Sequence, residues 1–173
     1  NVIQWLIGSS AGLIVGTVGG EFKLTGGTAP VTPTNVQVIP ETRYGSNNVT
    51  PIEAGRAVLY IQRAGTKLRE LAFNLDVDGL VAPDMTILSE HISAGGIVDM
   101  AYQQEPDTLV WLVRADGILI NATYERDQNV VAWARHPVGG YFGNATITVT
   151  DYANIAVGTT LVFTKSDGTT VTF

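Results

Sequence analysis

Short runs of β-branched and aromatic residues, broken by Gly, Asn and Asp, make up most of this chain, and helical periodicity is almost absent. Such runs, when bounded by turn residues, are typical of β-strands. The clearest example covers residues 109–136, in which Asp116 and Gly117 separate two apolar runs. Asp-Gly indicates a hairpin because Gly accepts the positive φ of a tight turn. A second break at residues 125–129 precedes the run 130–136, so this segment predicts three consecutive antiparallel strands.

Two other segments have a similar form. Residues 5–17 and 59–73 each combine an aromatic-bearing strand, a Gly turn and a returning strand. The turn glycines are Gly12, Gly65 and Gly117, at intervals of 53 and 52 residues. Near-equal spacing is typical of repeated sheets, each about the size of one propeller blade. The sequence therefore predicts an all-β fold of antiparallel hairpins and meanders with about three propeller-blade-like units. A non-repeating all-β chain can also show evenly spaced hairpins, and this alternative stays open.

A single segment, residues 82–92, has the pattern of a short helix. Asp84 is a candidate N-cap, Leu88 and Ile92 lie four residues apart, and Ser-Ala-Gly-Gly ends the segment. We therefore expect a helix of about two turns here.

The sequence changes character after His136, where residues 137–145 are rich in Pro and Gly. We place a boundary here, between a propeller-like β domain over residues 1–140 and the start of a small β module over residues 141–173. In the second segment, the Ser-Asp-Gly at residues 166–168 predicts a hairpin turn. This segment has too little core to be stable alone, so we expect the chain to be a piece of a longer protein.

Composition narrows the function classes. The 173 residues include 10 Lys and Arg against 16 Asp and Glu, a formal net charge of −6 at pH 7. This argues against general binding of a nucleic-acid backbone, which needs a basic face. The absence of cysteine excludes disulfides, zinc–thiolate sites and thiol nucleophiles. The apolar runs are too short for a membrane-spanning helix and no signal peptide is visible.

The charged fraction is only 15%, which is typical of a surface partly covered by neighbours. A local basic strip facing a partner stays open as an alternative to plain solvated charges. Its candidate residues lie near the hairpins and are Arg63, Lys67, Arg69, Arg114 and Arg126.

One acidic segment resembles the start of a calcium loop. Asn74, Asp76 and Asp78 alternate before Gly79, as in an EF-hand. The twelfth position, which should be a bidentate Glu, is Met85. We interpret the segment as a solvated turn after a strand.

Other candidate chemistry is equally sparse. His91 and His136 are too far apart for a ligand-like spacing, so we expect structural roles for both. Paired carboxylates can hydrolyse glycosidic bonds when they lie close together. The candidates for such a pair are Glu90, Asp99, Glu105 and Asp107, and nothing in the sequence shows that any two of them meet. We therefore expect no enzyme, no catalytic or metal-binding residue, no cofactor and no small-molecule substrate.

The three tryptophans allow two interpretations. Trp5, Trp111 and Trp133 can form a sugar-stacking platform, or they can fill the contacts between adjacent sheets. We favour packing, because each Trp buries a large apolar area.

Several stretches, taken in order, resemble a known family. They are "PTNVQV", "YGSNNVTPIEAGRAVLYIQRAGTKLRELAFN", "LSEHI" and "IVDMAYQQEPDTLVWLVRADGILINATYERDQNVVAWARH". This run, over about residues 33–136, resembles the large tail proteins of short-tailed phages, the tail tubular B or nozzle class. The segment from residue 145 to the end resembles a small β module often attached to phage tail proteins.

The resemblance implies a fold that includes a β-propeller, and a structural role in the virion tail. In that family, copies assemble in the bacterial host cytoplasm into a tube through which DNA leaves the capsid. The expected partners are further copies of the chain, neighbouring tail proteins and, through non-specific contact, the exiting DNA. The resemblance brings no catalytic residue, and we expect packing roles for Trp5, Tyr60, Gly65, Trp111, Asp116, Gly117, Tyr124, Trp133 and His136. The alternatives are a carbohydrate- or receptor-binding β module and a glycan-cleaving propeller enzyme.

Overall fold

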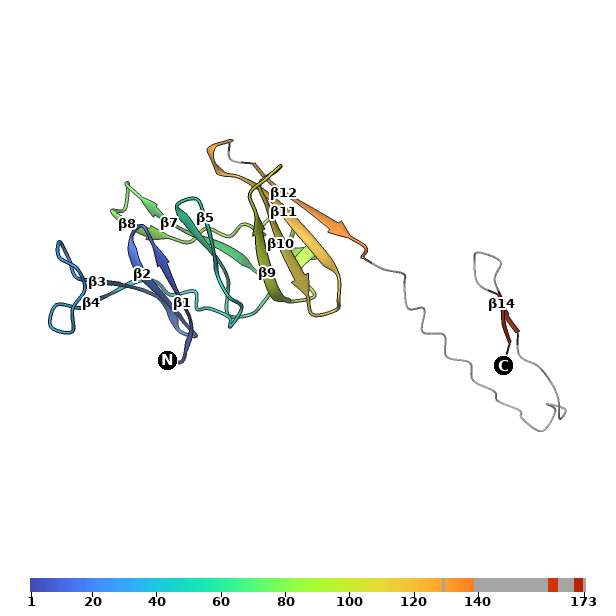
Figure 1. Cartoon of the computed structure of the whole chain (residues 1–173), viewed down its shortest axis with the longest axis horizontal. Coiled ribbons are helices and arrows are strands. Elements are labelled where there is room, and N and C mark those ends of the chain that lie inside the picture. Colours follow the sequence, from blue (N-terminus) through green and yellow to red (C-terminus); the bar gives the residue numbers. More distant parts are fainter. Residues whose placement is uncertain (129, 139–161, 165–169, 173) are drawn as a thin grey trace. The chain divides into compact units, whose positions relative to one another are not determined.

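The computed structural model describes residues 1–128, 130–138, 162–164 and 170–172. The chain divides into two compact units, Asn1–Gly139 and Gly140–Phe173. The described strands all pair in antiparallel fashion, which confirms the prediction of an all-β fold of hairpins and meanders. Unit 1 contains three four-stranded sheets in chain order (Figure 1).

Each sheet of unit 1 is a meander in which consecutive strands are neighbours. Sheet 1 consists of β1 (Ile3–Ser9), β2 (Gly12–Thr17), β3 (Gly20–Thr25) and β4 (Gln37–Thr42). Sheet 2 consists of β5 (Ile52–Ala54), β6 (Ala57–Ile61), β7 (Leu68–Asn74) and β8 (Gly79–Val81). Sheet 3 consists of β9 (Ile97–Gln103), β10 (Leu109–Arg114), β11 (Leu119–Glu125) and β12 (Val130–His136). This is the strand order of a propeller blade, although the described strands form no closed barrel.

The remaining elements are short. Helix α1 (Glu90–Ser93) joins sheet 2 to sheet 3, and a 3₁₀ turn η1 (Arg126–Gln128) joins β11 to β12. In unit 2, β13 (Val162–Thr164) pairs with β14 (Thr170–Thr172). The hairpin turn predicted at residues 166–168 lies outside the described residues.

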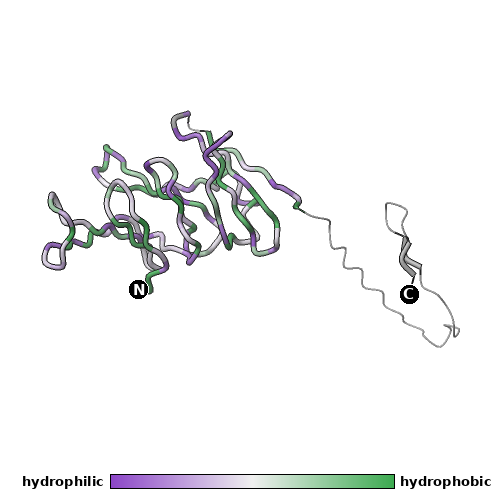
Figure 2. Tube along the Cα trace, in the orientation of Figure 1, coloured by the Kyte–Doolittle hydropathy of each residue, from purple (hydrophilic) through white to green (hydrophobic). Residues whose placement is uncertain are grey.

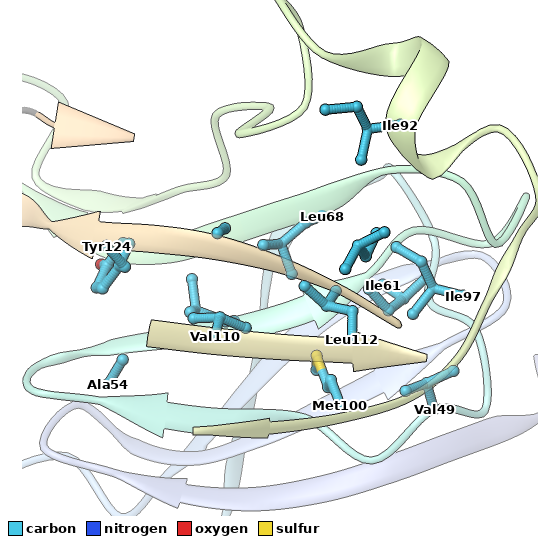
Figure 3. Close-up of a cluster of buried hydrophobic side chains, with 13 residues drawn as sticks. Val49, Ala54, Ile61, Leu68, Ile92, Ile97, Met100, Val110, Leu112 and Tyr124 are labelled. Carbon is cyan, nitrogen blue, oxygen red and sulfur yellow. The ribbon is translucent and has the colours of Figure 1, made fainter. Parts of the chain in front are cut away.

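Sheet 2 lies between sheets 1 and 3 (Figure 1). One buried cluster joins sheets 1 and 2 and contains Trp5, Ile14, Val58, Tyr60, Leu71, Leu80 and Ala82. A second, larger cluster joins sheets 2 and 3. Figure 3 shows Ile61 and Leu68 of sheet 2 pointing toward Val110 and Leu112 of sheet 3.

The position of sheet 2 explains why β6 has a continuous apolar sequence. Alternate residues of a strand point to opposite faces, so Val58 and Tyr60 meet sheet 1 while Leu59 and Ile61 meet sheet 3. Because both faces of β6 are covered, neither face contacts solvent and every position is apolar. Figure 2 shows apolar residues concentrated in the strands of unit 1 and hydrophilic residues in many of its turns.

The helix predicted over residues 82–92 is wrong in both extent and cap. α1 covers only Glu90–Ser93 and its N-cap residue is Ser89. Asp84 instead accepts hydrogen bonds from the backbone N–H and the hydroxyl of Thr86, which closes a local turn. Asx turns of this kind compete with helix formation, and Leu88 is left in solvent.

The predicted equivalence of Gly12 with Gly65 and Gly117 is also wrong. Gly12 follows the turn between the first and second strands of its sheet. Gly65 and Gly117 lie between the second and third strands of theirs. The corresponding turn of sheet 1 lies at residues 18–19, between β2 and β3.

Candidate functional site

A backbone hydrogen bond recurs at the same place in each sheet of unit 1. The turn between the second and third strands donates one N–H to a carbonyl that precedes the first strand, directly in sheets 1 and 3 and seven residues before β5 in sheet 2. The three bonds run from Val18 N to Val2 O (3.1 Å), from Arg63 N to Gly45 O (2.9 Å) and from Ala115 N to Gly96 O (2.8 Å). These bonds align sheets 1 and 3 residue by residue, and they align the second and third strands of sheet 2 with both.

A second set of bonds joins each sheet to the one before it. Ser46 N donates to Thr17 O of sheet 1 at 2.8 Å, and Ile97 N donates to Gly65 O of sheet 2 at 2.7 Å. Ser46 directly follows Gly45, and Ile97 directly follows Gly96, the residues whose carbonyls accept the bonds within sheets 2 and 3. We call this second set the inter-sheet stitches. They fix the register between neighbouring sheets, in addition to the apolar contacts.

Gly65 and Gly117 have the same conformation. Their φ angles are +81° and +82°, in the left-handed region where any residue with a Cβ would be strained. Each also closes a four-residue turn, since Gly65 N donates to Gln62 O and Gly117 N donates to Arg114 O. Asp116 contributes to the second turn by accepting hydrogen bonds from the Arg114 guanidinium. These turns form the end of unit 1 at which the stitches lie, which we call the stitched end.

Two of the aromatic residues singled out by sequence lie between sheets 1 and 2. The Trp5 and Tyr60 rings are 5.6 Å apart at their centroids and tilted by 53°. Burial raises the pKa of the Tyr60 hydroxyl, and the nearby Glu21 carboxylate adds to this effect. Glu21 is itself buried and accepts a hydrogen bond from the Ser46 hydroxyl at 2.8 Å. The Tyr60 hydroxyl therefore stays protonated at pH values at which an exposed tyrosine would ionise.

Tyr124 and Trp133 lie on the side of sheet 3 that faces sheet 2. Burial, and then the Glu70 carboxylate, raise the pKa of Tyr124. The Trp133 indole N–H donates to the backbone oxygen of Met85 at 3.0 Å. This bond ties β12 to the loop that follows sheet 2.

Trp111 lies on the opposite face of sheet 3. Its ring packs against His136 with centroids 4.9 Å apart, and its N–H donates to Gln103 Oε1 at 2.9 Å. The His136 ring bonds Asn121 Oδ1 at 3.0 Å, on the neighbouring strand. Trp5, Trp111 and Trp133 thus serve three different contacts and do not share a sugar-stacking platform.

The basic strip considered from sequence loses two of its five candidates to the interior. Arg69 and Arg114 are buried, whereas Arg63 is exposed. Arg69 lies 3.5 Å over the Tyr44 ring and bonds Gln62, whereas Arg114 donates to Ile92 O at 2.7 Å. These side chains hold the interior together.

The other two candidates of the strip, Lys67 and Arg126, bond carboxylates of the fold. Lys67 pairs with Asp84 at 2.7 Å and with Glu90 at 2.8 Å, and Arg126 pairs with Glu70 at 2.6 Å. Burial raises the pKa of Asp84, but hydrogen bonds from Lys67 and Thr86 outweigh it, so the net pKa lies below the ordinary value.

The acidic candidates are dispersed. Asn74 Oδ1 accepts the Asp76 N–H at 2.7 Å in the turn after β7, as expected for a solvated turn. Glu90 bonds Lys67 near the stitched end, whereas Glu105 and Asp107 lie in the turn after β9 at the other end of sheet 3. Among the described residues, no group of three or more His, Asp or Glu is placed to hold a metal ion. No helix in the described part of the chain is long and apolar enough to cross a membrane.

An open groove of about 990 Å³ lies at the end of unit 1 opposite the stitched end. Lys23 and Arg126 line it but are paired with Glu41 and Glu70, while Arg56 is exposed. Sequence reasoning missed this groove because its lining comes from all three sheets. The lining residues are Ser10, Ala11, Lys23, Ala54, Gly55, Arg56, Phe73, Leu75, Tyr102, Thr108, Tyr124, Glu125 and Arg126.

The stack of three sheets ends in two faces that no other sheet of unit 1 covers. The outer face of sheet 1 contains two cross-strand rows, Leu6–Val15–Phe22–Pro40 and Gly8–Leu13–Leu24–Val38. These rows contain no charged or hydrogen-bonding side chain. The outer face of sheet 3 contains Leu109, Trp111, Val113, Leu119, Ala101 and Ala134, with Asp99, Gln103, Asn121 and His136 among them.

Comparison with known proteins identifies no family for this chain. A scan against protein-family models finds no match, and a search of curated proteins finds no matching sequence.

Proposed function

We propose that this chain is a structural protein of a phage or prophage tail, of the nozzle or tail-tube type, that acts through subunit assembly. The observation that carries the proposal is the stack of four-stranded sheets with exposed apolar side chains, Leu6, Leu13 and Val38, on the outer face of sheet 1. Contiguous exposed apolar surface is a feature of association sites. The assignment to a phage tail is supported by the sequence resemblance over about residues 33–136.

The use of the polar side chains agrees with a structural role. Arg69, Arg114 and Lys67 bond groups of the fold, and the rings of Trp5 and Tyr60 fill an interface between sheets. The residues that could carry chemistry thus stabilise the stack, which supports assembly as the activity of the chain.

A native-particle measurement tests the proposal. Antibodies against the purified protein are used for immunogold electron microscopy of particles released when the source cells lyse. Label at the tail of capsid-bearing particles is the expected result. Antibody absorbed beforehand with the purified protein is the control. Label confined to material without capsids would contradict the proposal.

The groove favours a second candidate function, a carbohydrate- or receptor-binding module of a tail. Phe73 and Leu75 expose apolar surface in it, and Arg56 adds a charge. A glycan array read with the wild-type protein and the Phe73→Ala variant tests this candidate. Binding that is lost in the variant would support it, and an array without signal would remove it.

A further inference from the structure

The two outer faces of unit 1 correspond in position to faces that are buried inside the stack. The alignment set by the recurring bonds places Leu13 of sheet 1 at the position of Val110 in sheet 3, five residues before Val18 and Ala115 respectively. It also places Leu6 at the position of Met100. Both first strands skip one residue in register at the same point, after Ile3 and after Ile97.

Two of the equivalent pairs differ sharply in exposure, whereas Val15, at the position of Leu112, is buried as Leu112 is. Met100 is 7% exposed and Val110 0%, because sheet 2 covers them, whereas Leu6 is 57% exposed and Leu13 38%. The outer face of sheet 1 therefore has the same pattern as the face by which sheet 3 packs on its predecessor.

The outer face of sheet 3 shows the converse relation. Val113 occupies the position of Ile61, two residues before Ala115 and Arg63 respectively. Ile61 is 0% exposed because it packs on the following sheet, while Val113 is 39% exposed. This face has the pattern of a surface that receives a following sheet.

Backbone groups at the two ends of the stack show the same positional correspondence. Ile3 stands at the position of Ser46 and Ile97, whose N–H groups donate the inter-sheet stitches. The bond from Val18 N to Val2 O makes Ile3 and Thr17 a non-hydrogen-bonded pair, so the Ile3 N–H points away from its own ladder. At the other end of the stack, the Gly117 carbonyl corresponds to that of Gly65, which accepts the stitch between sheets 2 and 3, whereas the stitch between sheets 1 and 2 uses a different turn position, Thr17.

We infer that a second copy of this chain docks head to tail on the first. The outer face of sheet 1 of one copy packs on the outer face of sheet 3 of the next, and Ile3 N donates to Gly117 O across the contact. The contact continues the packing already present between sheets 2 and 3. It joins two different surfaces, so it generates a ring or an open filament. The inference rests on the assembly role proposed above and names the surface that performs it.

The test uses the full 173-residue protein and two blocking variants. Leu6→Lys places a charge on the outer face of sheet 1, and Val113→Lys places one on the outer face of sheet 3. Leu88→Lys is the matched control, because Leu88 is exposed and lies on neither face. Mass is measured by sedimentation velocity across a hundredfold range of concentration, and urea unfolding verifies that each variant is folded.

Head-to-tail docking predicts a distinctive pattern. The wild type and Leu88→Lys exceed the monomer mass of 18.4 kDa as concentration rises, and each blocking variant alone stays at that mass. An equal mixture of the two blocking variants forms a one-to-one dimer and nothing larger, since each keeps one intact face.

Three other outcomes would overturn the inference. If only one blocking variant prevents association, a single face pairs with itself. If neither does, copies assemble through another surface, and the proposed tail role stands without this interface. If the wild type stays monomeric throughout, self-docking is absent, and the immunogold experiment decides the tail role separately.

Discussion

Gly16 of β2 lies beneath the ring of Trp5 in β1. A Cβ at this position would lie 2.1 Å from Cε2 of Trp5. The ring cannot move aside, because it is buried against Tyr60. Gly16→Ala should therefore lower the free energy of unfolding by about 1–3 kcal/mol, the usual cost of overpacking.

In a variant that lacks the Trp5 ring, Gly16→Ala should raise the free energy of unfolding and not lower it. Trp5→Ala alone should cost about 3–5 kcal/mol, because it leaves a cavity between sheets 1 and 2. In that background the new methyl at position 16 has space, and Ala is favoured over Gly in a strand by about 0.5–1 kcal/mol. The two substitutions should therefore be coupled by about 2 kcal/mol or more, as residues in contact can be.

Urea unfolding followed by far-UV circular dichroism measures the four members of this cycle at one protein concentration. Gly8→Ala is the control, because a Cβ there meets nothing within 4 Å, and it should be neutral or stabilising. If Gly16→Ala costs the same with and without the Trp5 ring, steric contact with that ring is not the reason for glycine at this position.

Two further predictions concern pH. The raised pKa values of Tyr60 and Tyr124 keep both protonated in the folded state, so stability should fall as pH rises above 10, by about 1.4 kcal/mol per pH unit for each tyrosine. Urea midpoints from pH 8 to 12 should show a shallower fall for Tyr60→Phe, and an unchanged slope would contradict this. The lowered pKa of Asp84 favours its ionised form in the folded state. The stability that this carboxylate contributes to the fold is therefore present above pH 3.8 and is lost as the pH falls below that value. Asp84→Asn should cost about 1 kcal/mol at pH 7 and progressively less in acid, and an equal cost at pH 7 and pH 3 would contradict the ion pair with Lys67.

Local pattern was enough to predict the fold class. Asp116-Gly117 between two β-type runs indicated a hairpin, and the break at residues 125–129 indicated a third strand. β10, β11 and β12 confirm this meander. Turn chemistry and strand preference act between near neighbours, so they can be recognised without knowing the rest of the fold.

The failures have a common cause. Asp84 has the right type and position for an N-cap, but Lys67, which lies 17 residues earlier in the chain, holds its carboxylate in a turn. Gly12 has the same spacing as Gly65 and Gly117, but spacing alone does not show which turn of a sheet a glycine occupies. A competing local turn, supported by a distant lysine, decided the first case, and strand pairing across the sheet decided the second.

The sequence by itself determined that this chain forms antiparallel hairpins, where several of them turn, and that Trp5, Tyr60 and Trp111 lie in strands. Only the tertiary structure decided which face of each strand is covered. Val113 and Ile61 are both β-branched residues at the ends of equivalent strands, yet one is exposed and the other is buried. The physical reason is that burial depends on whether another sheet packs on that face, and the strand's own residues cannot encode the presence of that neighbour.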